Sequence, residues 1–325
     1  MLTKYIPWSL RGVGPFLNTY GDSFLFRGIL KSAPITVNPD ASTAIHSAVP
    51  HRYLYAYLYA IKSFLRFYDD VAVIVHDDGS LKSADYQLIQ KHLPGVEIIS
   101  RQLADQTFQE QYPDPFLAKV RSSYTSYLKL FDPTLFSKGK KIIILDTDTL
   151  FLIKPEKIID WCINGGVPWF HKSPTGQWEV SKKSEVQHAR LQDTHIQTLI
   201  MDDLDNINAT LDKDYSLEHG FCSGFIGYSA NTINFAELKN LFELLHEKFG
   251  DRIFRWGAEQ TTHGLILCGQ GAKGLAVEDY FVFTQANAHL ADKGTFVHFV
   301  GENRFFRFIY PKLAKQVLSD LLNKK

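Results

Sequence analysis

The feature that most constrains the fold is an alternation of strand and helix patterns in residues 42–99. Short apolar runs are separated by stretches in which apolar residues recur at helical spacing. The runs predict strands at residues 42–49, 71–75 and 96–99, and the stretches between them predict helices at residues 51–67 and 83–93, the second capped by Ser83 and ended by Pro94. Strands joined in this way lie parallel, with right-handed crossovers. The sequence therefore predicts an α/β fold with a mostly parallel central sheet and helices on both of its faces.

The rest of the chain is divided by its composition. At 325 residues, with 45% apolar and 22% charged residues, the chain has the size and composition of one large globular domain. Residues 1–40 are rich in glycine and proline and predict an irregular N-terminal arm with one short strand. We assign residues 41–325 to a single large domain, in which the polar residues 173–214 form a variable insertion.

Further elements of this domain follow from the same patterns. Strands are predicted at residues 142–145, 167–171, 275–283 and 295–299, and helices at residues 118–131, 155–161, 235–249 and 256–267. Residues 101–115 predict a loop or a short helix. Asp132-Pro133 should end the helix before it, on which Arg121 is expected to be a solvated charge. No apolar strand leads into the acidic pair Asp203-Leu-Asp205, which predicts a solvated loop.

The C-terminal residues 302–325 predict an amphipathic basic helix. They contain six Lys or Arg and two Asp or Glu, so their net charge is six minus two, or +4. Apolar residues from Phe305 to Leu321 recur on one face. We expect this face to dock on the sheet, and weak contact with an anionic membrane surface is the alternative.

Two carboxylates follow directly after an apolar strand. Asp146 and Asp148 come after the run that ends at Leu145, with Thr147 between them. Residues two apart in extended chain point the same way, and α/β sheets bind ligands at the carboxyl ends of their strands. Two such close carboxylates repel unless a cation lies between them, and Mg²⁺ or Mn²⁺ prefers oxygen ligands of this kind. The alternative is a solvated polar turn that closes the strand.

A second polar segment, His76-Asp77-Asp78, follows the strand predicted at residues 71–75. These side chains are placed to contact a nucleotide base or ribose at the same edge of the sheet. A turn closed by Asp78-Gly79 explains the same residues, and both interpretations remain open at this point.

The totals exclude several classes of protein. The formal net charge is zero, so no overall positive field favours nucleic acid. Three isolated cysteines, Cys162, Cys222 and Cys268, form neither a disulfide framework nor a zinc motif and favour a reducing, cytoplasmic setting. Residues 1–14 lack the continuous apolar core of a secretory signal, and no run approaches the roughly 18 apolar residues of a membrane span.

Four motifs in order along the chain carry a resemblance to a known family. They are Ile-Ile-Leu-Asp146-Thr-Asp148, Phe221-Cys-Ser-Gly224, Trp256-Gly-Ala-Glu259-Gln260 and His298-Phe-Val-Gly301-Glu-Asn-Arg304. Together they resemble the motifs of nucleotide-diphospho-sugar transferases of the GT-A fold, and most of all glycosyltransferase family 8 and its bacterial relatives. The likeness extends over residues 42–310.

The resemblance implies a metal site and a donor site. Asp146, Asp148 and His298 would bind Mn²⁺ or Mg²⁺, and an imidazole beside two carboxylates favours Mn²⁺. The metal would hold the diphosphate of a nucleotide-sugar, with UDP the usual nucleotide of the family. Gly301 would allow backbone N–H groups to approach a phosphate, and Arg304 would add a positive contact.

The resemblance also implies where the sugar reacts. Ser223 and Gly224 would lie where sugar and acceptor meet, and Lys129 lies near the place of a donor-binding arginine. Glu259 and Gln260 would lie on the face where the anomeric carbon reacts, with Glu259 orienting the acceptor hydroxyl or stabilising an oxocarbenium-like state. The family default is retention of anomeric configuration, and the acceptor is a carbohydrate, lipid or protein.

The sequence departs from the family pattern at two motif positions. Arg304 replaces a lysine, which keeps the charge but changes the phosphate geometry. Cys222 replaces an asparagine, which removes an amide that holds sugar or acceptor. Three alternatives follow: a nucleotide-sugar hydrolase or pyrophosphatase with the same metal site, a non-catalytic nucleotide-sugar binding protein, and a Rossmann-type nucleotide-binding protein. The last lacks a Gly-x-Gly-x-x-Gly segment after the first strand.

Overall fold

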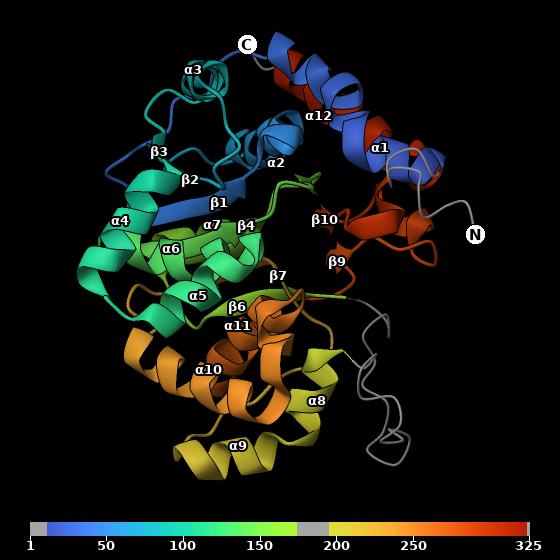
Figure 1. Cartoon of the computed structure of the whole chain (residues 1–325). Helices are drawn as coiled ribbons and strands as arrows, with labels where there is room; N and C mark the ends of the chain where they lie inside the picture. Colours follow the sequence, from blue (N-terminus) through green and yellow to red (C-terminus); the bar gives the residue numbers. More distant parts are fainter. Residues whose placement is uncertain (1–11, 174–194, 324–325) are drawn as a thin grey trace. The chain divides into compact units, whose positions relative to one another are not determined.

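The computed structural model describes residues 12–173 and 195–323 (Figure 1). Residues 1–11 of the predicted arm, 174–194 of the predicted insertion and 324–325 of the predicted C-terminal helix lie outside the described residues. The chain forms two compact units. The first unit comprises residues 1–101, 145–165 and 278–325, and the second comprises residues 102–144 and 166–277. Helices and strands occur in both units, so the predicted α/β class is confirmed.

The first unit begins its sheet with the predicted strand–helix alternation. The elements are β1 (Thr43–Val49), η5 (His51–Tyr53), α2 (Leu54–Leu65), β2 (Ala72–Asp77), α3 (Ser83–His92) and β3 (Glu97–Ile99). β1 and β3 both pair parallel to β2, with Ile45 opposite Val73 and Val75 opposite Ile98. β1 and β2 are buried almost throughout. β2 accordingly begins with a continuous apolar run, whereas β1 also buries the polar residues Thr43, His46 and Ser47. Ser83 does not cap α3, because it is the first helical residue after Lys82.

A second group of strands in the first unit brings distant segments together. The elements are β5 (Thr149–Phe151), α7 (Glu156–Asn164), β9 (Tyr280–Val282), η9 (Ala288–Leu290) and β10 (Phe296–His298). β10 pairs parallel to β9 and antiparallel to β5. Among the residues that the structure describes, most of the strand pairs are parallel. In this register His298 lies opposite Thr149, next to the predicted Asp-x-Asp segment.

The prediction of an irregular N-terminal arm is wrong for residues 13–31. These residues form α1 (Val13–Gly21), the π-helix η3 (Asp22–Phe26) and the 3₁₀-helix η4 (Arg27–Lys31). Leu17, Phe26 and Ile29 are buried, and this packing outweighs the low helix propensity of the glycines. Asp22 accepts hydrogen bonds from Tyr55 N (3.2 Å) and Ala56 N (2.7 Å), so it caps the start of α2. Burial raises the pKa of the Asp22 carboxyl to about 7.

The C-terminal segment docks by its apolar face, but on α2, η3, η4 and η10 rather than on the sheet as predicted. It begins with η10 (Gly301–Phe308) and continues as α12 (Ile309–Asn323), so the long helix starts at Ile309 and not at residue 302. Leu313, Val317 and Leu321 are buried. The Arg66 guanidinium pairs with Asp320 at 2.5 Å and fastens α12 to α2. Within residues 12–173 and 195–323, no helix has the length and apolar character needed to cross a membrane.

The second unit contains one strand group and most of the remaining helices. Its strands are β6 (Trp169–Lys172), β7 (Phe221–Tyr228), β8 (Lys273–Gly274) and, for all but its last residue, β4 (Lys141–Leu145); β7 lies between β4 and β6. β6 pairs antiparallel to β7 and parallel to β8. The helices are α4 (Arg101–Gln111), α5 (Pro115–Ser123), η6 (Thr125–Tyr127), α6 (Leu128–Phe136), α8 (Ile196–Asp202), α9 (Leu204–Leu211), α10 (Phe235–Phe249), η8 (Gly250–Phe254) and α11 (Ala258–Gly269).

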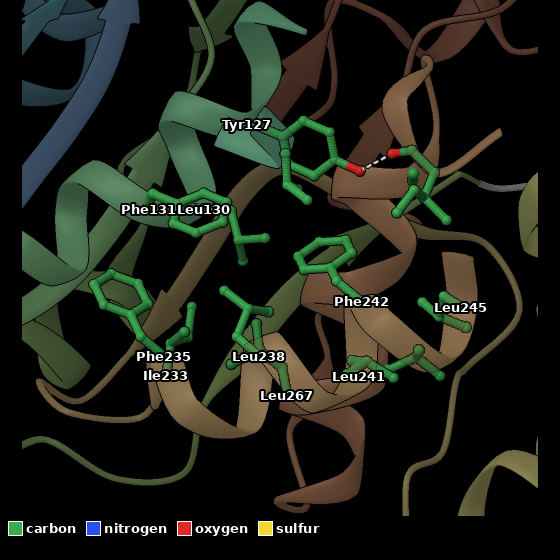
Figure 2. Packing of buried hydrophobic residues seen from close by; sticks show 14 of the residues in the cluster. Tyr127, Leu130, Phe131, Ile233, Phe235, Leu238, Leu241, Phe242, Leu245 and Leu267 are labelled. Carbon is green, nitrogen blue, oxygen red and sulfur yellow. Dashed lines mark hydrogen bonds between the residues drawn. The ribbon is translucent and has the colours of Figure 1, made fainter. Parts of the chain in front are cut away.

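The core of the second unit is built where α10 packs against α6 (Figure 2). Asn234 caps α10, because its side-chain oxygen accepts hydrogen bonds from Ala236 N and Glu237 N. The ring of Phe131 stacks at 5.5 Å from Phe235 and 6.4 Å from Phe242. The helical spacing of apolar residues along residues 235–249 therefore arises because these residues form the face of α10 that packs against α6.

Three predictions for the second unit are wrong. The helix predicted at residues 118–131 breaks at Tyr124, and α6 continues through Pro133 to Phe136. Arg121 is buried rather than solvated: its Nε donates to Asp132 Oδ1 at 2.7 Å and its Nη2 to Oδ2 at 3.1 Å. This bidentate ion pair stabilises the turn of helix α6 that contains Pro133.

The acidic pair at residues 203 and 205 is not a loop. Asp203 precedes α9 and Asp205 lies in its first turn, where a carboxylate favours the helix dipole. Asp203 also pairs with Lys248 at 2.8 Å. Both acidic residues therefore have structural explanations, in agreement with their exclusion from the predicted site.

Candidate metal and donor site

The backbone around the Asp-x-Asp segment is fixed by hydrogen bonds in the first unit. Ser47 Oγ donates to the carbonyl of Leu145 at 2.7 Å, where β4 ends. Thr149 Oγ1 donates to the carbonyl of Asp146 at 2.9 Å, and Phe299 N donates to the carbonyl of Asp148 at 2.8 Å. These bonds hold the tight connection between β4 and β5 and leave both aspartate side chains for other partners.

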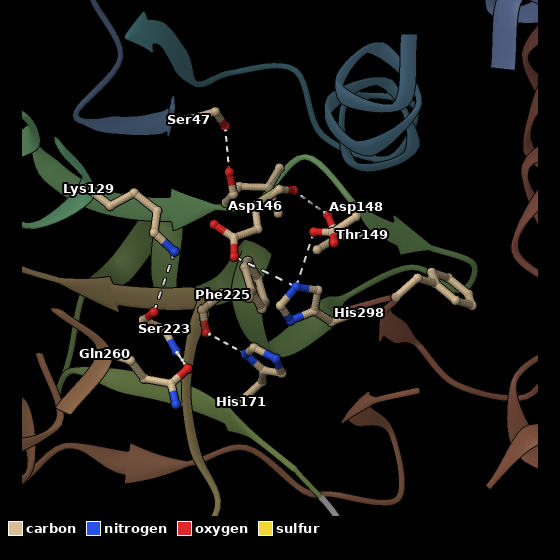
Figure 3. Close-up of polar contacts among 12 residues, drawn as sticks. Ser47, Lys129, Asp146, Asp148, Thr149, His171, Ser223, Phe225, Gln260 and His298 are labelled. Carbon is tan, nitrogen blue, oxygen red and sulfur yellow. Dashed lines mark hydrogen bonds and ion pairs between the residues drawn. The ribbon is translucent and has the colours of Figure 1, made fainter. Parts of the chain in front are cut away.

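Three predicted metal ligands converge at this point (Figure 3). His298 Nε2 lies 3.1 Å from Asp148 Oδ1 and 3.7 Å from Asp146 Oδ2. The side chains of His298 and Asp148 are 3% and 9% exposed, whereas that of Asp146 is 23% exposed. The cluster therefore has two buried members and one that faces more open space.

Arg304 holds the second oxygen of Asp148. Its Nη2 pairs with Asp148 Oδ2, its Nε donates to the carbonyl of Phe299 at 3.1 Å, and its guanidinium carbon lies 4.5 Å from the centre of the Tyr53 ring. Burial alone would raise the pKa of Asp148, but the charges of Arg304 and His298 outweigh burial and hold that pKa well below its usual range. Asp148 is thus a carboxylate with one oxygen fixed by Arg304 and the other turned toward His298.

These residues fit a small divalent cation. One ligand atom from each of Asp146, Asp148 and His298 lies within 4.8 Å of the others. Ligand atoms about 2.1 Å from an octahedral ion lie roughly 3 to 4 Å apart, so small side-chain movements suffice to bind Mg²⁺ or Mn²⁺. The charge-assisted contact with Arg304 would orient Asp148, as contacts to metal-binding carboxylates commonly do.

Gly301 begins η10 after β10. Its φ of +62° lies in the left-handed region that glycine adopts without strain, and a Cβ added there would meet no atom within 4 Å. The backbone at Gly301 is therefore accessible to a ligand, as the predicted phosphate contact requires.

A second group of predicted site residues meets in the second unit. Lys129 Nζ lies 3.8 Å from Glu259 Oε1 and donates to Ser223 Oγ at 3.5 Å. Gln260 Oε1 accepts from Ser223 N at 3.4 Å (Figure 3). Gly224 follows Ser223 in the fully buried strand β7. The structure thus brings together Lys129, Ser223, Glu259 and Gln260, which come from three separate segments of the chain.

Glu259 is positioned by the start of α11. Gly257 precedes the helix with a φ of +94°, and a Cβ there would lie 2.2 Å from His195 Nε2, so only glycine fits. Glu259 then falls in the first helical turn, where the macrodipole favours a negative charge. Glu259 is buried, with only 4% of its surface exposed to solvent.

His263 is a member of this group that the sequence analysis missed. It lies one turn after Glu259 on α11, with Nε2 3.5 Å from Glu259 Oε1, and it is fully buried. Burial and the nearby charge of Lys129 lower the pKa of His263 to about 3, so the ring is neutral. The signal was the spacing of four residues from Glu259, which places two side chains on one helix face.

The side chains of residues 76–78 mainly contact other groups of the protein. β2 extends through Asp77, two residues beyond the predicted end of the strand. Asp77 Oδ1 accepts from Gly79 N and Leu81 N, and its Oδ2 accepts from Tyr86 Oη at 2.8 Å. Asp78 Oδ1 accepts from Ser80 N. These contacts match the turn interpretation, and nucleotide contacts by Asp77 and Asp78 remain a prediction.

His76 itself is buried beside another histidine. Its Nε2 lies 2.9 Å from Nδ1 of His46 on the neighbouring strand β1, and the two rings stack. Burial, followed by the charge on His76, lowers the pKa of His46 well below its usual value. His76 is therefore part of the packing between β1 and β2.

Known structures with a similar fold are glycosyltransferases. WbbM, described as a bifunctional glycosyltransferase in its apo form, matches with a TM-score of 0.51 and 14% identity over 89% of this chain and 53% of WbbM. This chain thus spans about half the length of WbbM. GlyE, a glycosyltransferase of Streptococcus pneumoniae TIGR4, matches with a TM-score of 0.48 and 11% identity over 88% of this chain and 64% of GlyE. The galactosyltransferase LgtC, in complex with donor and acceptor sugar analogs, matches with a TM-score of 0.45 and 14% identity over 86% of this chain and 95% of LgtC.

The likeness to WbbM shows the fold of this chain. It is a mixed α/β fold of the GT-A type, as the four motifs led us to expect. No protein-family model matches the sequence, and no curated protein matches it. Membership of glycosyltransferase family 8 therefore stays a prediction. Because one fold supports many activities, the reaction has to be argued from the two residue groups.

Proposed function

We propose that this protein is a metal-dependent glycosyltransferase. It would move a sugar from a nucleoside diphosphate, UDP by resemblance, to a hydroxyl group of a carbohydrate, lipid or protein acceptor. The observation that carries the proposal is the convergence of Asp146, Asp148 and His298 after a buried strand, in a chain with a glycosyltransferase fold. WbbM, GlyE and LgtC are named as glycosyltransferases, which supports this class of reaction.

The first unit supplies the residues that bind the donor diphosphate. Asp146, Asp148 and His298 would hold Mn²⁺ or Mg²⁺, and the imidazole favours Mn²⁺. The bound ion would stabilise negative charge on the departing nucleoside diphosphate. The accessible backbone at Gly301 adds N–H donors for phosphate. Arg304 keeps Asp148 charged and oriented, and its guanidinium would add positive charge for the phosphate.

The second unit supplies the residues that act on the sugar. The buried Glu259 carboxylate would orient the acceptor hydroxyl or stabilise positive charge at the anomeric carbon. Lys129 Nζ lies 3.8 Å from Glu259 Oε1 and places a positive charge beside it, and the neutral His263 has its Nε2 3.5 Å from the same oxygen. Ser223 and Gln260 would contact hydroxyl groups of the sugar or acceptor. The proposed outcome is retention of anomeric configuration.

Water in place of the acceptor would give a nucleotide-sugar hydrolase or pyrophosphatase with the same residues. A binding protein would hold the donor without turnover. The buried carboxylate group at Glu259, which metal binding does not require, favours a protein that acts on the sugar.

Donor binding is tested by thermal denaturation with UDP, GDP, CDP and ADP and their sugars, each with and without Mn²⁺. A ligand of the native state raises the melting temperature by mass action. We expect one nucleotide to raise it only when Mn²⁺ is present, and Asp146→Asn to remove this effect. Release of nucleoside diphosphate that requires an added acceptor would establish transfer. Equal release without any acceptor would identify the hydrolase instead. Release of nucleoside monophosphate and sugar phosphate would identify the pyrophosphatase, and donor binding with neither kind of release would identify the binding protein.

A further inference from the structure

An aromatic stripe lies exposed along α1 and η3 of the first unit. Val13, Phe16, Tyr20 and Phe24 are 73%, 42%, 46% and 53% exposed. Their spacing of three, four and four residues places them along one side of a helix. The Phe16 ring lies 5.2 Å from that of Tyr20 and 6.5 Å from that of Phe24, so the side chains form one continuous patch. We call these four residues the α1 stripe.

The concentration of the α1 stripe is unusual for this protein. Across residues 12–173 and 195–323, thirteen large apolar side chains are exposed, and four of them fall between residues 13 and 24. Single exposed apolar side chains are ordinary, whereas a contiguous apolar patch marks a surface that binds another protein, a ligand or a membrane. Leu17 and Gly21, on the other side of α1, are buried, so the helix is already docked and the stripe is a second apolar face.

A fourth exposed aromatic residue, Phe308, belongs to the same region. η10 packs against α1, since a Cβ at Gly21 would lie 3.0 Å from the Phe305 ring. Phe308 at the end of η10 is 50% exposed, and both Arg307 and Phe308 have left-handed backbone conformations, with φ of +49° and +54°. Such conformations are costly for bulky residues, so a Phe held in one and facing water suggests a function for its exposure.

The charges around these aromatic residues are mainly positive. The exposed basic residues of η4, η10 and α12 are Arg27, Lys31, Arg307, Lys312 and Lys315. Residues 12–31 and 301–323 contain three acidic residues, Asp22, Glu302 and Asp320. Asp22 is buried at the start of α2, and Asp320 is paired with Arg66. The exposed surface thus combines large aromatic residues with an excess of cations.

We propose that the α1 stripe and Phe308, with the cations of η4, η10 and α12, dock this protein on an anionic membrane surface. Aromatic side chains enter the boundary between headgroups and acyl chains, and lysine and arginine are attracted to anionic headgroups. The buried apolar face of α12 is not available for this contact, so the surface differs from the one suggested by the C-terminal sequence pattern. The proposal is independent of the glycosyltransferase assignment.

The test is co-sedimentation of the full chain with vesicles of phosphatidylcholine, alone or mixed with phosphatidylglycerol. Wild-type protein should bind the anionic vesicles, and binding should weaken as salt is added. The variant Phe16→Ser/Tyr20→Ser/Phe24→Ser should lower the partition coefficient by about tenfold or more, because it removes the inserted apolar area. Lys312→Gln/Lys315→Gln should lower binding to anionic vesicles by about fivefold per charge.

Matched control variants remove similar groups elsewhere. Ile163→Ser removes a side chain that is 60% exposed, and Lys157→Gln removes a charge from an exposed residue of α7. Neither should change vesicle binding. The proposal is overturned if wild type does not bind anionic vesicles, or if the stripe variant binds as wild type does. It is also overturned if wild type instead forms a dimer that the stripe variant disrupts. Should the triple variant fail to fold, Phe24→Ser and the lysine variant carry the same test.

Discussion

Because Arg304 pairs with Asp148, replacing Asp148 should lower the stability of the protein more than replacing Asp146, the other proposed metal-binding aspartate. Both Asp146→Asn and Asp148→Asn remove a proposed metal ligand. Only Asp148→Asn also removes the carboxylate that pairs with the buried Arg304, whose side chain is 11% exposed. Asp148→Asn should therefore destabilise the metal-free protein, and Asp146→Asn should not.

The expected size follows from burial. Removing one partner of a buried ion pair costs about 3–5 kcal/mol, because the other charge is left unpaired. The Arg304 guanidinium keeps its contact with the Phe299 carbonyl, so we take the lower end, about 3 kcal/mol. For a chain of 325 residues that lowers the melting temperature by roughly 4 °C. Asp146 is more exposed, and its replacement should cost less than about 1 kcal/mol.

The assay is thermal denaturation of wild type, both single variants and Asp148→Asn/Arg304→Gln in the presence of a chelator. The double variant should regain part of the loss, because no buried charge remains unpaired. Equal melting temperatures for Asp146→Asn and Asp148→Asn would refute the reasoning. A double variant with a lower melting temperature than Asp148→Asn alone would also refute it.

Three further predictions concern other residues. Glu259→Gln should lower kcat by about a hundredfold or more while leaving the nucleotide-induced thermal shift intact, which steady-state kinetics and thermal denaturation would measure together. Arg121→Met should destabilise the protein by about 3–5 kcal/mol in urea denaturation, because Asp132 is left buried and charged, and Arg121→Met/Asp132→Leu should recover most of that loss. Burial raises the folded-state pKa of Asp22 to about 7. Its unfolded value is about 4, so its contribution to stability is complete below about pH 4 and is lost as pH rises to 7. Asp22→Asn should therefore remove that part of the decline in unfolding free energy between these pH values, and an unchanged pH dependence would contradict the assignment.

Much of the fold was predictable because local pattern and tertiary environment agree. β2 and β4 are buried on both faces and contain continuous apolar runs, and α10 shows the period of its contact with α6. Residues 13–31 were misjudged because their glycines signal irregular chain, whereas burial of Phe26 and Ile29 stabilises helical turns. Propensity describes the isolated segment, and these contacts come from residues far away in sequence.

The site was predictable as a set of residues but not as a set of contacts. Asp146, Asp148 and His298 do converge, and Lys129, Ser223, Glu259 and Gln260 do meet. The motifs did not reveal that Arg304 pairs with Asp148, since the two lie 156 residues apart. His263 was missed because a lone histidine in an apolar helix is most often a packing residue. Its spacing of four residues from Glu259 was the one signal in the sequence, and the 3.5 Å distance in the structure gives that spacing its meaning.

The central claim is that Asp146, Asp148 and His298 form a metal site that holds the donor nucleotide. The most direct test is the thermal shift produced by UDP and Mn²⁺ together, compared between wild type and Asp146→Asn. The account predicts a rise in the wild-type melting temperature that needs both ligands, and no rise in the variant, although the two proteins melt alike without ligand. The same rise in both proteins would contradict it.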